Sequence, residues 1–281
     1  MEIGSNIKAE FSFFDKKIEI KHSEFYKVFA HLNNNSFAYT IFDLKNEEFL
    51  ALESFIFNEE KDLTKIISEF PVFNWNLNSI SFNYFNKNCT IIPNALFEDK
   101  YKKKYFEINN NIESSEEILI NKLNHLNAIT IYTIPKIQLS EINKLKNFKI
   151  KHSASIFIDN ILKQTKNSNK SELFADVSTN NFDIAFIEKS KLIFYNNFKF
   201  KTNNDFLYYI LNCYNTLELN SNEITLRLSG EFNKEIVLNN LKKYIKNVII
   251  ENKPKSLSYC HLFNNVPSHY FHKLYNQYKC E

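Results

Sequence analysis

Glycine is almost absent from this sequence, since the 281 residues include only Gly4 and Gly230. Loops that bind phosphate bring backbone N–H groups close to phosphate oxygens, in conformations that glycine adopts without strain. Arginine, which clamps phosphates in a bidentate manner, is limited to Arg227. These shortages argue against an ATP-hydrolysing or phosphate-transferring enzyme. The sequence favours a protein without catalytic activity and contains no candidate catalytic residue.

Paired cysteines are also lacking. The four cysteines form no Cys-x-x-Cys pair: Cys89, Cys213, Cys260 and Cys280. Scattered cysteines in a chain of this size are typical of free thiols in a reducing compartment. The first ten residues have no apolar stretch of the signal-peptide kind, and no run approaches the ~20 apolar residues of a membrane span. We therefore expect a soluble, cytoplasmic protein.

Neither sign of charge dominates. Lys and Arg number 35 and Asp and Glu 32, which gives a net charge of +3. This surplus is too small to indicate a nucleic-acid or membrane partner by itself. Apolar residues, in contrast, make up 44% of the chain and aromatic residues 16%. That is enough for a large core, and it excludes disorder across the whole chain.

The apolar pattern divides the chain into two halves that begin alike. Runs of β-branched and aromatic residues between Asn-rich turns predict hairpins. Three strands are expected at the start of each half: 25–32, 36–44 and 49–57, then 172–177, 182–188 and 192–200. A further strand is expected at 11–20.

Helices are expected after these strands. Apolar spacing predicts one over 63–70, and Thr202 followed by Asp205 is a capping-box-like start for its counterpart. Paired serines and glutamates predict another helix over 116–126, and 267–278 is expected to form a closing helix.

The polar run at 163–170 is the best candidate for a boundary, which gives domains 1–168 and 169–281. Each half has three strands followed by helix, strand, helix, strand and helix. This order predicts a mixed five-stranded sheet flanked by helices. We expect an α/β protein with two tandem actin-like (ribonuclease-H-like) domains that arose by internal duplication.

Six blocks carry a resemblance to a known family. They are SFAYTIFD (36–43), LALE (50–53), IPNALF (92–97), YNNF (195–198), DFLYYI (205–210) and LRLSG (226–230). Their order and spacing resemble a bacterial family of uncharacterised proteins with an actin-like ATPase fold, a domain of unknown function. The resemblance implies the fold and no activity, because the family has none assigned.

The resemblance also implies a nucleotide cleft. In actin-like ATPases the first hairpin of each domain wraps the phosphates, typically as Asp-x-Gly. The hairpin at 32–36 has neither residue, and the second has Ser178 where glycine belongs. Ser229-Gly230 resembles the turn on the adenosine side. The candidate cofactor-binding residues are Asp176, Ser178, Thr179, Ser229 and Gly230, and weakly bound ATP is the only cofactor that they suggest.

Two further sets contain metal-binding residue types. One gathers near the C-terminal end: Cys260, His261, His269, His272 and Cys280. It matches no zinc signature, and packed cysteines with surface histidines are the commoner arrangement. The other would suit a ribonuclease-H-type nuclease: Asp43, Asp176, Asp183 and Glu188. Because Asp183 and Glu188 have opposite strand parity, at most one faces a shared site. We expect no metal.

Two segments are candidate partner surfaces. Cations alternate with aromatic residues at 100–106, where single-stranded nucleic acid could bind Lys100, Lys102, Lys103 and Lys104. A solvated loop is the commoner outcome for such a segment. The closing helix could present aromatic rings to a protein, although core packing is commoner. Those rings are Tyr270, Phe271 and Tyr275.

The favoured function is a non-catalytic, actin-like interaction or scaffold protein with a degenerate nucleotide cleft and an unidentified protein partner. A nucleotide-binding switch with weak ATP affinity is one alternative. An RNA- or DNA-associated factor is the other.

Overall fold

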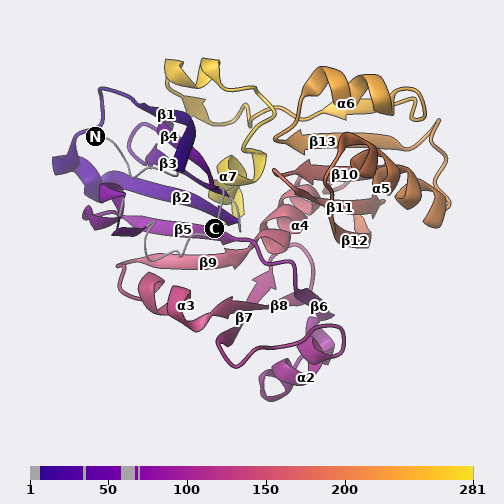
Figure 1. Ribbon diagram of the computed structural model, residues 1–281, viewed down its shortest axis with the longest axis horizontal. Helices are drawn as coiled ribbons and strands as arrows, with labels where there is room; N and C mark the ends of the chain where they lie inside the picture. The colour runs from indigo at the N-terminus through magenta and orange to yellow at the C-terminus, as the bar shows by residue number, and fades with distance from the viewer. Residues whose placement is uncertain (1–6, 34–35, 58–66, 69, 281) are drawn as a thin grey trace. The chain divides into compact units, whose positions relative to one another are not determined.

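The computed structural model describes residues 7–33, 36–57, 67–68 and 70–280, which form two compact units (Figure 1). Unit 1 contains the chain up to Ile156, together with Lys255–Val266 and the segment from Gln277 onward. Unit 2 contains Phe157–Pro254 and Pro267–Asn276. The expected division at 168/169 differs from this one, because the chain changes unit inside a helix and returns to unit 1 twice.

Unit 1 is built on a seven-stranded sheet, two strands more than the five that the sequence predicts. The strand order is β1-β4-β3-β2-β5-β9, and β15 also pairs with β4. The strands are β1 (Ile7–Phe14), β2 (Tyr26–Asn33), β3 (Ser36–Asp43), β4 (Glu48–Phe57), β5 (Ser79–Tyr84), β9 (Phe148–His152) and β15 (Ser258–Tyr259). The additional strands are β1 and β15, and β15 comes from the far end of the sequence.

A smaller three-stranded sheet, ordered β6-β8-β7, also belongs to unit 1. Its strands are β6 (Cys89–Pro93), β7 (Glu116–Leu123) and β8 (Ala128–Pro135), and α2 (Lys102–Glu107) packs on it through the buried Phe106. The helix expected over 116–126 is therefore wrong. Leucines at helical spacing also fit a strand here, because β7 pairs along its whole length with β8.

Unit 2 has a five-stranded sheet in the order β12-β11-β10-β13-β14. The strands are β10 (Ser171–Val177), β11 (Asn181–Glu188), β12 (Lys191–Lys199), β13 (Thr225–Gly230) and β14 (Val248–Ile250). Helices α5 (Asn203–Thr216) and α6 (Lys234–Leu241) cover one face, where residues such as Leu173, Phe182 and Leu226 form a buried apolar core.

The remaining helices are α3 (Lys136–Ile142), α4 (Ser153–Gln164) and α7 (His272–Asn276), with 3-10 helices at Ile20–Phe25, Pro71–Asn74, Asn94–Leu96, Asp99–Tyr101, His261–Asn265 and Gln277–Cys280. The closing helix is thus shorter than expected. The helix expected over 63–70 falls largely outside the described residues. Within the described part of the chain, no helix is long and apolar enough to cross a membrane.

The same strand order occurs in both units. In unit 1, β4, β3 and β2 form an antiparallel meander that β5 and β9 extend in parallel. In unit 2, β12, β11 and β10 form the meander and β13 and β14 extend it.

Candidate functional site

A row of polar residues crosses the second face of the unit 2 sheet. Asp176 on β10 is the register partner of Asp183 on β11 and of Ser229 on β13, and Asp183 is also the partner of Asn197 on β12. Register partners project from the same face of a sheet, so four adjacent strands present one continuous polar row. Asp176 and Asp183 are 2% and 0% exposed.

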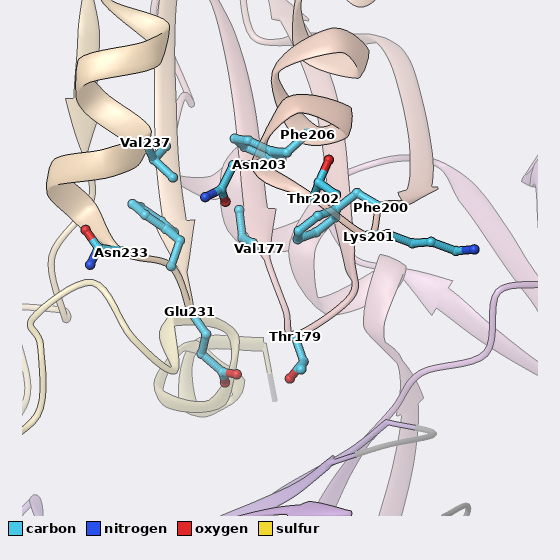
Figure 2. A pocket seen from close by; sticks show the side chains of 11 residues that line it. Val177, Thr179, Phe200, Lys201, Thr202, Asn203, Phe206, Glu231, Asn233 and Val237 are labelled. Carbon is cyan, nitrogen blue, oxygen red and sulfur yellow. The ribbon is translucent and has the colours of Figure 1, made fainter. Parts of the chain in front are cut away.

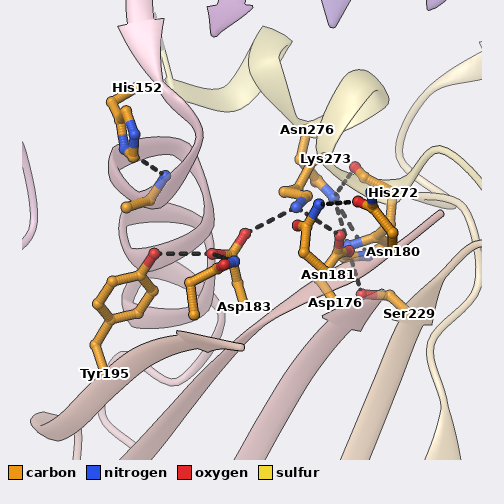
Figure 3. Close-up of polar contacts among 12 residues, drawn as sticks. His152, Asp176, Asn180, Asn181, Asp183, Tyr195, Ser229, His272, Lys273 and Asn276 are labelled. Atoms are coloured by element: carbon orange, nitrogen blue, oxygen red, sulfur yellow. Dashed lines mark hydrogen bonds and ion pairs between the residues drawn. The ribbon is translucent and has the colours of Figure 1, made fainter. Parts of the chain in front are cut away.

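Lys273 of α7 places its ammonium against both carboxylates (Figure 3). Its Nζ lies 3.0 Å from Asp176 Oδ1 and 2.8 Å from Asp183 Oδ2. The lysine is 6% exposed, so all three charges are withdrawn from water. A buried charge is strongly unfavourable unless it is paired and hydrogen-bonded, and here each charge has a partner of opposite sign.

Neutral donors complete the coordination of the carboxylates. Tyr195 OH and Asn197 Nδ2 donate to Asp183 Oδ1 over 2.8 and 2.9 Å. Ser229 Oγ donates to Asp176 Oδ2 over 2.5 Å. These contacts hold both carboxylates in a single orientation.

The pKa values follow from this arrangement. Burial alone would lower the pKa of Lys273, but Asp176 and Asp183 outweigh burial and raise the pKa above its ordinary value. Burial alone would raise the pKa of Asp183, but Lys273, Asn197 and Tyr195 together lower it. The site therefore holds a protonated lysine beside an ionised Asp183.

Gly230 ends β13 next to this row. Its φ of +101° and its position against Val177 both require glycine, since a Cβ would lie 2.0 Å from the Val177 carbonyl oxygen. The Gly230 N–H donates to the His269 carbonyl over 2.8 Å. This glycine allows two parallel strands to approach each other, and a protein acceptor already uses its N–H.

A pocket of about 470 Å³ lies on the opposite side of the unit 2 sheet (Figure 2). Val177 contributes to it from β10, while its sequence neighbour Asp176 faces the polar row, because successive strand residues point to opposite faces. The pocket is lined by Val177, Thr179, Phe200, Lys201, Thr202, Asn203, Phe206, Glu231, Phe232, Asn233 and Val237.

Two helices begin at this pocket, and both are capped by their own side chains. Thr202 Oγ1 accepts from Asp205 N at the start of α5, and Asn233 Oδ1 accepts from Ile236 N at the start of α6. These caps use N–H groups that an anionic ligand would otherwise bind. Glu231 adds negative charge to the lining.

The five candidate cofactor-binding residues are thus distributed over different surroundings. Asp176 and Ser229 belong to the polar row, and Gly230 lies against Val177. Ser178 is buried and its N–H donates to the Asn181 carbonyl. Thr179 alone of the five is among the residues that line the pocket. Side chains alternate between the two faces of β10, so Asp176 and the pocket lie on opposite sides of the sheet. This alternation follows from the residue positions in the sequence.

Lys273, Tyr195 and Asn197 also belong to this site, although the sequence patterns did not identify them as candidates. The signal was weak but present, because Lys273 lies among the apolar residues Phe271, Leu274 and Tyr275, which are all buried. Two aspartates in the middle of apolar strands likewise need a counter-charge.

The metal-capable residues near the C-terminal end have separate partners. Cys260 is buried with its Sγ 3.7 Å from the Leu50 carbonyl, and His269 Nε2 lies 3.2 Å from the Phe232 carbonyl. His272 lies against Asn276, and the exposed His261 is 4.0 Å from Asp15. Across the described ranges no three His, Cys, Asp or Glu residues gather as a metal site would require. The side chain of Cys280 is outside the described part.

The nuclease-type carboxylates meet only in part. Asp176 and Asp183 are adjacent, while Glu188 is exposed at the end of β11. Asp43 lies in unit 1, where it accepts from Lys45 N and Asn46 Nδ2. Cys89, Cys213 and Cys260 carry free thiols.

The basic segment at 100–106 is helical, not a loop as expected, because it forms the end of Asp99–Tyr101 and most of α2. Its cations interact with residues of the segment or directly beside it: Lys100 pairs with Glu98, Lys102 with Asp99 and Lys103 with Glu107, and Lys104 lies over the Tyr101 ring. The closing aromatic residues Phe271 and Tyr275 are buried, as expected for core packing.

A model of one family matches residues 15–248, which is most of the chain, under the description protein of unknown function (DUF3822). The chain belongs to this family. The expected relationship to an uncharacterised family is therefore confirmed. Among proteins with curated descriptions, none matches the chain.

Solved structures show the fold that this family member has. A protein of unknown function with an actin-like ATPase fold from Bacteroides thetaiotaomicron is 22% identical, with a TM-score of 0.76 over 94% of this chain and 99% of the other. The PilM-PilN type IV pilus biogenesis complex includes a chain that is 8% identical, with a TM-score of 0.59 over 92% and 99%. The expected mixed α/β, actin-like class is confirmed at this level.

Proposed function

We propose that this chain is a non-catalytic, actin-like interaction protein whose second unit has lost the chemistry of phosphate transfer. One observation carries the proposal: the ammonium of Lys273 binds Asp176 and Asp183. A carboxylate that positions a metal ion or an attacking water must be free to do so. Here both carboxylates are buried against a permanent internal cation.

Three features of unit 2 support this reading. The hairpin after Asp176 has no glycine, and the Gly230 N–H donates to His269. Each helix that begins at the pocket is capped by its own side chain. A nucleotide would therefore find few free N–H groups and the negative charge of Glu231 in the lining.

The repeated strand order supports an origin by tandem duplication, with domains near 1–168 and 169–281. A sheet of five strands in the order β4-β3-β2-β5-β9 would be the common element, and β1 and β15 would be additions to the first copy. We infer that a duplicated fold without phosphate chemistry persists as a surface for another protein. The similar PilM-PilN structure is a complex, which supports the expectation of a protein partner. We also propose a cytoplasmic location.

Calorimetry and turnover measurements test the non-catalytic part. Titration of the full chain with Mg-ATP should give no saturable heat up to millimolar concentration, and phosphate release should equal the buffer blank. Binding in the micromolar range, or turnover that disappears in Asp176→Asn, contradicts the proposal. The interaction part predicts a complex of fixed stoichiometry when partners are purified from the native host and analysed by size-exclusion chromatography.

The pocket favours a second candidate, a nucleotide switch that binds ATP weakly without hydrolysing it. Its volume of about 470 Å³ and its aromatic wall of Phe200, Phe206 and Phe232 suit a flat ring. A nucleotide screen by thermal shift separates the two candidates. The switch is supported if a nucleotide stabilises the unaltered chain and Lys191→Trp on β12 but not Thr179→Trp, which would fill the pocket. If no nucleotide stabilises the chain, the switch is excluded and the interaction protein remains as the proposed function.

A further inference from the structure

We propose that the pocket of unit 2 binds a small organic cation, in which an aromatic or aliphatic body carries an ammonium group. Three rings of the lining form what we call the phenylalanine cage: Phe200, Phe206 and Phe232. The inference goes beyond the proposed function, because an interaction protein requires no small ligand and a nucleotide brings the opposite charge to the same pocket.

The rings of the cage come from three separate segments of unit 2. Phe200 follows β12, Phe206 lies near the start of α5, and Phe232 precedes α6. The centroids of Phe200 and Phe206 are 5.6 Å apart, and Phe206 and Phe232 are largely buried, so their positions are fixed by packing. Aromatic rings attract an ammonium group through the negative charge of their faces, and most strongly where water is excluded. A concave lining with three rings therefore suits a cation.

The N–H groups that would attract an anion are already used at this pocket. Thr202 Oγ1 accepts from Asp205 N, and Asn233 Oδ1 accepts from Ile236 N. The Asp205 carboxylate in turn accepts from the N–H groups of Lys201 and Thr202, and these two bonds lower the pKa of Asp205. An ionised carboxylate thus offsets the positive end of α5. The pocket therefore lacks the usual means by which a helix terminus binds phosphate.

Carboxylates outnumber ammonium groups around the pocket. Glu231 belongs to the lining, and Asp205 and Glu235 lie in the first turns of the two helices that begin there. The cations are Lys201 in the lining and Lys234 at the start of α6. Figure 2 shows the Lys201 ammonium pointing away from the interior of the pocket. The excess of negative charge favours a cationic ligand over an anionic one.

The pocket has room for such a ligand and divides into an apolar and a polar part. Its volume of about 470 Å³ is within the usual range for small-molecule sites. Val177 and Val237, both buried, extend the apolar lining beside the cage. Glu231 and Thr179 supply acceptor oxygens, which Figure 2 shows on one side of the pocket. The body of the ligand packs on the apolar part, and its ammonium group lies between the rings and these oxygens.

Three probes that share one phenyl ring and differ in charge test the proposal. They are benzylammonium, which is cationic, benzyl alcohol, which is neutral, and benzoate, which is anionic. Each is titrated into the full chain by calorimetry at constant ionic strength and neutral pH. We expect benzylammonium to bind about tenfold more tightly than benzyl alcohol, and benzoate to bind most weakly. No binding of benzylammonium at millimolar concentration, equal affinity for the three probes, or a preference for benzoate overturns the proposal.

Two variants locate the preference in the pocket. Phe232→Leu keeps an apolar side chain and removes a ring, so it should abolish the preference for benzylammonium over benzyl alcohol. Phe194→Leu is the matched control, because Phe194 packs on the same core from β12 outside the pocket lining, and it should keep the preference. An unchanged preference in Phe232→Leu contradicts the cage. If Phe232→Leu does not fold, Glu231→Gln decides: weaker binding of benzylammonium alone supports the site, and unaltered binding overturns it.

ATP separates this inference from the nucleotide switch, which would use the same pocket. Stabilisation by ATP without a response to benzylammonium overturns the cation site and leaves the switch. A response to benzylammonium without one to ATP excludes the switch and supports the cation site. Neither result bears on the absence of catalysis, which the measurement of phosphate release tests separately.

Discussion

Gly230 and Val177 are register partners on adjacent parallel strands, and a Cβ on residue 230 would lie 2.0 Å from the Val177 carbonyl oxygen. Gly230→Ala should therefore lower the free energy of unfolding by roughly 2–4 kcal/mol, from the positive φ and the steric overlap together. Urea denaturation followed by circular dichroism measures the change. Lys234→Ala, exposed at the start of α6, should change stability by less than about 0.5 kcal/mol. Equal stability of the two variants would mean that β13 does not need glycine.

Lys273 should be essential for stability and sensitive to alkaline pH. In metal-free buffer near pH 7, Lys273→Met leaves Asp176 and Asp183 buried without their counter-charge and should cost about 3–5 kcal/mol. The raised pKa of Lys273 means that its contribution is complete below about 10.5 and is lost as pH rises through the folded-state value.

Denaturation of both proteins from pH 7 to 11 reads out this effect. The stability gap between the unaltered chain and Lys273→Met should narrow at the alkaline end. A gap that stays constant with pH would show that the lysine acts through packing alone.

His269 should make the protein less stable in mild acid. Burial lowers its pKa, against the hydrogen bond to the Phe232 carbonyl, and Lys234 lowers it further. A lowered folded-state pKa gives stability that is present above about 6.5 and lost as pH falls toward the folded-state value. The melting temperature should drop between pH 7 and 5, and His269→Gln should reduce that drop. His261→Gln, whose side chain is 80% exposed, is the matched control and should retain it.

Arg227 should not be replaceable by lysine. Its Nε donates to Glu172 over 2.9 Å and a terminal nitrogen donates to Glu251 over 2.6 Å, which links β13 to its neighbours. Lysine cannot make both contacts in this geometry, so Arg227→Lys should cost about 1–2 kcal/mol in chemical denaturation. Lys242→Arg on the exposed surface should be neutral within about 0.5 kcal/mol. A neutral Arg227→Lys would show that one of the two glutamates contributes nothing.

Much of the fold was predictable because local chemistry specifies it. The Asn-rich turns gave the hairpins of both meanders, and the Thr202–Asp205 capping box marks the start of α5 as expected. The exceptions depend on distant partners. The leucines at 116–126 fit a helix until β8 pairs with them. Strand β15 exists only because Ser258 and Tyr259 reach Glu48 and Phe49.

The candidate site was predictable only in its strand residues. Asp176 and Ser229 were identified from the hairpin and the turn, and the register of β10 with β13 joins them. Lys273 lies 90 positions from Asp183, and nothing local indicates that α7 delivers it there. Because side chains alternate between the two faces of a strand, the sequence could have predicted that Asp176 does not share a site with Thr179 and the pocket.

The discontinuity of unit 1 has a consequence for its synthesis on the ribosome. Strand β4 pairs with β15, Leu50 contacts Cys260, and the Ala30 carbonyl accepts from the Gln277 amide. In each case the second partner is synthesised only after all of unit 2 up to Pro254. The part of the protein that is made first is therefore completed last. During translation the sheet of unit 1 therefore lacks the pairing of β15 and the Gln277 contact until the segments after Pro254 have emerged.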